Sequence, residues 1–229
     1  MPGAANAVAN RGHPTRDVAA DFISRKLWAE FAGTPVPAGV LTDLRTVAVT
    51  NDFSIRPWLR ALLTHPEFYT PEVRSGRVRT PVEYVVAALA ATGHRSAVAT
   101  PLWLMEGMGQ RPLYPPNVSG WRHNAYWINA GAMARRTDAA RSFMWRSMQG
   151  YWDGDGLIRL AGGTLSRSQI EDAYRDRPAD LVDRFLELMR LDPEPAMRQA
   201  LVDFSVASYR WERPDLIAMI LVAPDFHLA

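Results

Sequence analysis

The chain has 229 residues, of which 48% are hydrophobic and 22% charged, and its formal net charge is +2. This length is sufficient for one large domain or two small ones, with a core that needs no cross-links. There is no cysteine, which excludes disulfides, thiolate metal sites and a thiol nucleophile. The arginines are interleaved with acidic residues instead of clustering, so the sequence argues against nucleic-acid binding.

The longest apolar stretches, such as Tyr84 to Ala91, are far shorter than the roughly 20 residues that a membrane-spanning helix needs. We therefore expect no membrane span. Residues 1–13 lack the basic region and apolar core of a signal peptide, and we expect them to form a flexible lead-in. The sequence predicts a cytoplasmic location by default, or export if the natural N-terminus lies upstream.

Apolar residues recur at helical spacing along the whole chain, and no convincing strand-like alternation appears. The sequence therefore predicts an all-α fold, an irregular multi-helix bundle with one long loop rich in aromatic residues and proline. A helix start is clearest at Thr80, where Pro81 takes the first turn and Glu83 completes a capping box. The other helices expected in this first part span 14–32, 37–50 and 55–65.

The helix that starts at Thr80 is expected to end at Gly93, and the next to span residues 97–108. Leu102, Trp103 and Met105 predict that this next helix is deeply buried, because it is almost uniformly apolar. Later helices are expected over residues 125–147, 166–175, 178–190, 195–208 and 214–222.

A turn cluster at residues 153–156, followed by Gly162-Gly163, marks the main internal boundary that we predict. It is not a calcium loop, since no Glu follows the glycine at the required distance. We expect three parts: a flexible lead-in (1–13), a main helical domain (14–152) that includes the loop at 107–127, and a C-terminal helical lobe (153–229) packed on that domain.

The sequence also contains an internal echo. Residues 56–68, RPWLRALLTHPEF, resemble residues 213–226, RPDLIAMILVAPDF. Each reads as a helix that begins near one proline and is stopped by a second. We expect Phe68 and Phe226, just beyond these stops, to fold back and bury against the helices before them.

The segment GMGQRPLYPPNVSGWRHNAYWIN, residues 107–129, is too rich in proline and glycine for a regular helix or strand. It has two interpretations. Its rings stack on a sugar or a partner's proline while its amides donate hydrogen bonds, or its aromatics pin the loop and its amides satisfy turn backbone. We favour the second. The candidate binding residues are Gln110, Tyr114, Asn117, Trp121, His123, Asn124, Trp127 and Asn129, of which His123 is the foremost.

Motifs for catalysis are missing. None of the five histidines forms an i, i+4 pair, so we predict no metal site. Val118-Ser119-Gly120 lacks the first glycine of a nucleophile elbow, and no glycine-rich phosphate loop is present. We predict no cofactor, identify no catalytic residue, and leave open whether the chain is an enzyme.

Several segments together resemble the C-terminal half of a bacterial family known as domain of unknown function 1800. The resemblance implies about twice this length, with an Asn-Glu-Asn motif in an upstream half that this chain lacks. It also implies relatives that look exported and are encoded beside another exported family. The segments that carry the resemblance are FISRKLWAEF (22–31), LRALLTHPEF (59–68), RTPVEYV (79–85), MGQ and PPNVSGW within 108–121, WIN (127–129) and PDF (224–226).

The first functional hypothesis is a helical interaction module, one half of a larger family architecture, that pairs with another protein chain or with a second copy of itself. The alternative is a hydrolase or glycan-binding protein that acts on a cell-envelope polymer through the aromatic loop at 107–129.

Overall fold

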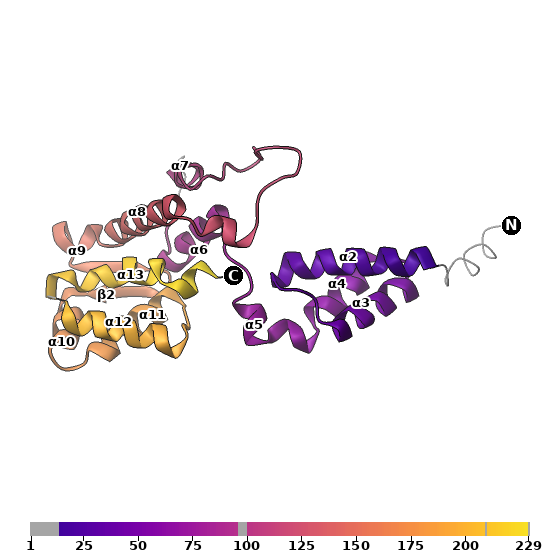
Figure 1. Ribbon diagram of the computed structural model, residues 1–229. Coiled ribbons are helices and arrows are strands. Elements are labelled where there is room, and N and C mark those ends of the chain that lie inside the picture. Colours follow the sequence, from indigo (N-terminus) through magenta and orange to yellow (C-terminus); the bar gives the residue numbers. More distant parts are fainter. Residues whose placement is uncertain (1–13, 96–99, 209, 229) are drawn as a thin grey trace. The chain divides into compact units, whose positions relative to one another are not determined.

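The computed structural model describes residues 14–95, 100–208 and 210–228, and it divides into two compact units (Figure 1). The first unit ends at Arg77, and the second spans Val78 to Leu228. Helices make up most of the described residues, which confirms the all-α prediction. None of these helices is long and apolar enough to cross a membrane. The predicted lead-in, residues 1–13, lies outside the described residues.

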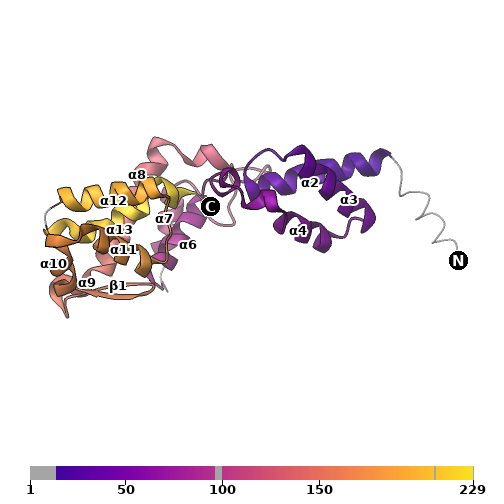
Figure 2. The same ribbon diagram turned by 90° about the horizontal axis from the view of Figure 1, so that it is seen from below.

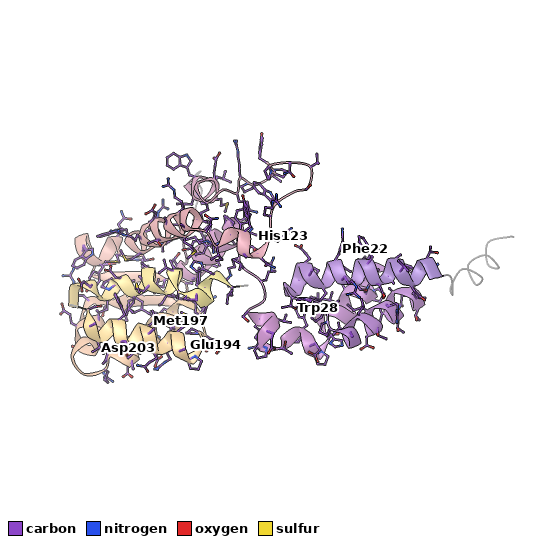
Figure 3. The ribbon with its side chains drawn as sticks, viewed as in Figure 1. Phe22, Trp28, His123, Glu194, Met197 and Asp203 are labelled. Atoms are coloured by element: carbon purple, nitrogen blue, oxygen red, sulfur yellow. The ribbon has the colours of Figure 1, made fainter. Side chains whose placement is uncertain are left out.

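The first unit is a helical bundle around two tryptophans. Trp28 and Trp58 are buried, and their indole N–H groups donate to Thr34 Oγ1 (3.2 Å) and Ser24 Oγ (3.1 Å). Figure 3 shows Phe22 on the opposite side of its helix from this core, and its side chain is 58% exposed. The elements are α2 (Pro14–Ala32), α3 (Ala38–Thr50), α4 (Ile55–Leu63), η1 (Pro66–Tyr69) and α5 (Pro71–Arg74).

The second unit begins with the helix start that the sequence predicted. Thr80 and Glu83 form the capping box, and Gly93 ends the helix with a φ of 72°. The elements are α6 (Pro81–Thr92), α7 (Thr100–Gly107), η2 (Asn124–Trp127), α8 (Ala130–Ser147), α9 (Gln149–Asp153), β1 (Leu157–Leu160), β2 (Gly163–Ser166), α10 (Arg167–Asp176), α11 (Pro178–Met189), α12 (Pro195–Ala207), η3 (Arg210–Asp215), α13 (Leu216–Val222) and η4 (Pro224–His227).

A short antiparallel hairpin, β1–β2, occupies the predicted turn region and was not predicted. Leu157 pairs with Ser166, and Leu160 pairs with Gly163. The hairpin lies along one edge of the unit beside α9 and α10 (Figure 2). Ile158 and Leu165 bury their side chains in the core, so a strand pair this short is held by packing more than by its own ladder.

The predicted domain boundary at residues 152 and 153 lies inside the second unit. Phe143 on α8 and Ile217 on α13 belong to the same hydrophobic core, and these two helices pack directly on one another. The division falls instead at Arg77 and Val78, because the buried apolar residues before it form a separate core. The turn cluster at 153–156 therefore lies within the second unit, directly before the hairpin.

The internal echo corresponds to the same local structure in each unit. The N–H of Phe68 donates to His65 O and that of Phe226 donates to Ala223 O, both at 3.0 Å. The Phe68 ring then meets Trp28 edge-on at 5.9 Å. The Phe226 ring meets a tyrosine of α6 in the same way at 5.6 Å. Each unit therefore carries one 3-10 turn whose phenylalanine packs back on its own helices.

Candidate functional site: the anchored loop

The loop between α7 and η2 is fixed at its first end by Gln110. This side chain is only 7% exposed, and its Oε1 accepts a hydrogen bond from the N–H of Val82 (3.0 Å). Val82 lies in the first turn of α6, where backbone N–H groups have no partner within the helix. Gln110 therefore ties the loop to the start of α6.

Two asparagines fix the other end of the loop. Asn124 Oδ1 accepts from the N–H of Val78 (3.3 Å). Asn129 caps α8 by accepting from Ala132 N (2.9 Å), and its amide donates to Tyr126 O (2.9 Å). Both amides satisfy backbone groups, as the favoured interpretation of the sequence expected.

Trp127 is the main aromatic anchor. It is 2% exposed, and its indole N–H donates to Arg122 O (2.8 Å). The Tyr126 ring packs edge-on against it at 5.1 Å, and the Trp121 ring lies at 6.3 Å with a tilt of 45°. A flat platform of two exposed tryptophans, which glycan stacking would require, is not formed here.

The middle of the loop points apolar side chains at solvent. Leu113 is 95% exposed and Val118 is fully exposed. Tyr114 is 65% exposed, with the Arg111 guanidinium 4.4 Å from its ring centre. Asn117 Oδ1 accepts from the N–H of Ser119 (2.9 Å), which closes a turn at the tip. Figure 1 shows this segment leaving the helical body as an extended loop.

His123, the foremost candidate, lies just before η2, where Figure 3 labels it. It lines an open hollow of about 510 Å3 together with Asn117, Trp121, Arg122 and Tyr126. No described residue lining this hollow is acidic. The hollow thus brings together several of the predicted residues, but it lacks the carboxylate that acid–base hydrolysis needs.

The prediction that α7 is deeply buried was wrong. Trp103 is 79% exposed and Leu102 is 53% exposed, while Met105 alone of the three is buried. An apolar hollow of about 400 Å3 lies between α7 and α8, lined by Trp103 and Leu104 on one side and by Arg135 on the other. Apolar composition alone does not imply burial, because an eight-residue helix that packs on α6 and α8 leaves its outer face uncovered.

Sequence reasoning missed a second polar hollow, of about 530 Å3, in the same unit. His94 Nε2 lies 3.2 Å from Ser147 Oγ, and Arg146 and Arg159 line the same space. Burial, and then the charge of Arg146, lower the pKa of His94, while a hydrogen bond to the Phe143 backbone opposes them. These residues come from separate elements, so no spacing in the sequence could have indicated the hollow.

A buried cluster around Arg136 was also missed. Arg136 is fully buried, donates to His227 Nδ1 (2.8 Å) and to Arg79 O (2.6 Å), and lies over the Tyr84 ring at 5.0 Å. Burial and the neighbouring Arg136 charge lower the pKa of His227 to about 4, and burial raises the pKa of Tyr84. The cluster joins α6, α8 and the segment before α6 to η4, so it holds the C-terminal segment in place.

Among the described residues, no three His, Asp or Glu side chains lie close enough to hold a metal ion. The fold and the loop define a helical protein of two units, the second of which presents an apolar loop from a rigid scaffold. The chain belongs to the family of proteins of unknown function DUF1800, whose family model matches residues 13–228. No curated protein and no solved structure matches the chain.

Proposed function

We propose that the chain is a non-catalytic interaction module that binds another protein chain through α7 and the loop that follows it. The observation that carries the proposal is the exposure of large apolar side chains on an anchored scaffold. Trp103 is 79% exposed, and Leu113, Tyr114 and Val118 are exposed on the loop. Tryptophan and tyrosine contribute most of the binding energy at many protein interfaces.

The anchored ends of the loop favour affinity for a partner, in addition to the exposed apolar side chains. The loop ends are held by Gln110, Asn124 and Asn129 through hydrogen bonds to backbone groups. Pro112, Pro115 and Pro116 further restrict the backbone between them. A loop that is ordered before binding loses less conformational entropy when a partner covers it, so its apolar contacts contribute more to the net affinity.

The alternative, hydrolysis or binding of an envelope glycan, draws less support. Trp127 is unavailable for stacking because it is buried, and the hollow beside His123 has no acidic lining residue. The amides proposed for ligand contact already satisfy the loop backbone. These observations weaken the glycan alternative, whereas apolar protein recognition uses the side chains of α7 and the loop that remain exposed.

The test is the solution mass by light scattering, for the chain alone and mixed with the protein encoded next to it. We expect a dimer or a stable heterocomplex that Trp103→Ala weakens about tenfold or more, as for a hot-spot tryptophan. Trp145→Ala is the matched control, because Trp145 is also exposed (55%) but lies on α8. It should leave the complex unchanged.

A monomer that ignores its neighbour at all concentrations would sink the proposal. A complex weakened by Phe22→Ala but not by Trp103→Ala would instead move the contact to the outer face of α2, where Phe22 is exposed.

A further inference from the structure

The second polar hollow is formed where several elements of the second unit end. Gly93 closes α6, Ser147 ends α8, Gln149 begins α9, and Arg159 lies on β1. All four residues, with His94 and Arg146, line a space of about 530 Å3. This volume is within the range of small-molecule sites.

The side chains of this hollow are predominantly hydrogen-bond donors. Arg146 and Arg159 supply two guanidinium groups, and Ser147 and Gln149 add a hydroxyl and an amide. None of the described residues that line the hollow is acidic. Asp155, just outside the lining, pairs with both terminal nitrogens of Arg159, so the charge of Arg159 is already offset by a carboxylate.

The missing side chain of Gly150 contributes to this arrangement. A Cβ at this position would collide with the Arg159 guanidinium and would lie 2.8 Å from Asp155 Oδ1. Glycine at position 150 therefore leaves room for the Arg159–Asp155 pair beside the start of α9. This keeps the guanidinium group of Arg159 at the edge of the hollow.

Helix ends offer a competing explanation for the arginines. The C-terminal ends of α6 and α8 carry partial negative charge, and a nearby cation stabilises such an end by about 0.3–1 kcal/mol. That role accounts for Arg146. It does not account for the convergence of Arg159, Gln149, Ser147 and His94 on the same space, because none of them is needed to stabilise a helix end.

We propose that this hollow binds the phosphate group of a small phosphorylated molecule, with Arg146 as its principal charged contact. Arg159, Gln149 and Ser147 supply further donors, and the rest of the volume accommodates the organic part of the ligand. Guanidinium groups match the geometry of phosphate oxygens, and a dianion offsets the charge that Arg146 carries without an acidic partner on the hollow's lining.

His94 makes the site observable. Its ring contacts Ser147, and it faces Arg146 from α8 and Arg159 from β1 across the hollow. Burial and Arg146 lower the pKa of His94, so a bound anion should raise it again. The ring signal, assigned by comparison with His94→Gln, therefore reports binding without any knowledge of the natural ligand.

The experiment follows the His94 ring by NMR while inorganic phosphate, and separately glycerol phosphate, is added at constant ionic strength. We expect saturable shifts, with binding weakened about tenfold in Arg146→Gln and largely retained in Arg146→Lys. Arg184→Gln is the control, since Arg184 lies on α11, outside the hollow. It should bind as the unchanged chain does.

Tighter binding of glycerol phosphate than of inorganic phosphate supports a phosphate ester, and equal binding supports free phosphate at the same site. A shift that never saturates, or that is the same in Arg146→Gln and in the control, would overturn the proposal and leave Arg146 as a helix-end residue.

Discussion

Nη1 of Arg136 lies 2.8 Å from Nδ1 of His227, across ninety-one positions of the chain. A guanidinium has only donors, so Nδ1 must accept, and the single N–H of a neutral ring is then on Nε2. That nitrogen lies 3.1 Å from Val222 O, where it donates. The pair therefore holds His227 neutral and fixes its tautomer, while the ring stacks on Tyr84 at 5.5 Å.

Acid should destabilise the second unit through His227. Its pKa is about 4 in the folded chain and about 6.5 when unfolded, because burial and Arg136 oppose its charge. The unfolded state then binds more protons between these values. The stability contributed by the neutral ring is complete above pH 6.5 and is lost as the pH falls toward 4, by roughly 2 kcal/mol after allowance for solvent screening.

Urea unfolding of the chain and of His227→Gln between pH 7 and pH 4 checks this loss. The variant cannot take up the proton, so its free energy of unfolding should fall less over this range. Parallel curves for the two proteins would contradict the expectation.

Removal of the buried arginine should be costly. Arg136→Ala leaves His227 Nδ1 and Arg79 O without their donor in a buried site, and we expect a loss of about 3 kcal/mol in the free energy of unfolding. The neighbouring Arg135→Ala is the control, because the Arg135 side chain is 64% exposed and forms a long ion pair with Asp138 at 3.7 Å. Equal effects of the two substitutions would show that Arg136 is not a structural centre.

The hydrogen bond between Gln110 and Val82 should keep the loop ordered. Gln110→Ala removes the acceptor for the Val82 N–H, which frees the first end of the loop. We expect faster tryptic cleavage after Arg122, read by mass spectrometry, because local opening exposes the backbone to protease. Gln199→Ala on α12 should leave this rate unchanged, since among the described residues Gln199 bonds just the Asp203 side chain.

Loss of the cap on α6 should be measurable in the same unit. Thr80→Ala removes the acceptor for the Glu83 N–H and breaks the capping box, at a cost of about 1 kcal/mol in unfolding free energy. Thr137→Ala serves for comparison, because Thr137 lies within α8 and its hydroxyl donates to Met133 O in the preceding turn of the same helix. An equal loss of unfolding free energy in Thr137→Ala would show that the cap makes no specific contribution to stability.

The sequence predicted local structure best where one residue type has one physical role. Thr80, Pro81 and Glu83 marked a helix start, and Pro14–Ala32 matched α2. It failed for α7, because periodicity does not tell whether a neighbour covers an apolar face. The β1–β2 hairpin was missed because its strands have four residues each, too few for an alternating pattern to stand out.

The candidate site was predicted as a segment but not as a surface. The amides at 110, 124 and 129 are candidate ligand contacts under one of the two interpretations of the loop, and all three bond the chain's own backbone. The hollow around His94 and Arg146 depends on contacts between α6, α8 and β1, and such contacts leave no trace in local spacing. Only the tertiary structure brings those side chains together.

The two hydrophobic cores share no residue, one lying entirely before Arg77 and the other entirely after Val78. Thermodynamically the chain should therefore melt as two proteins joined by a peptide bond, with two calorimetric transitions. A ligand raises the midpoint only of the part that it binds. Calorimetry with any partner or phosphate compound would then assign the binding event to one half of the chain before a single residue is changed.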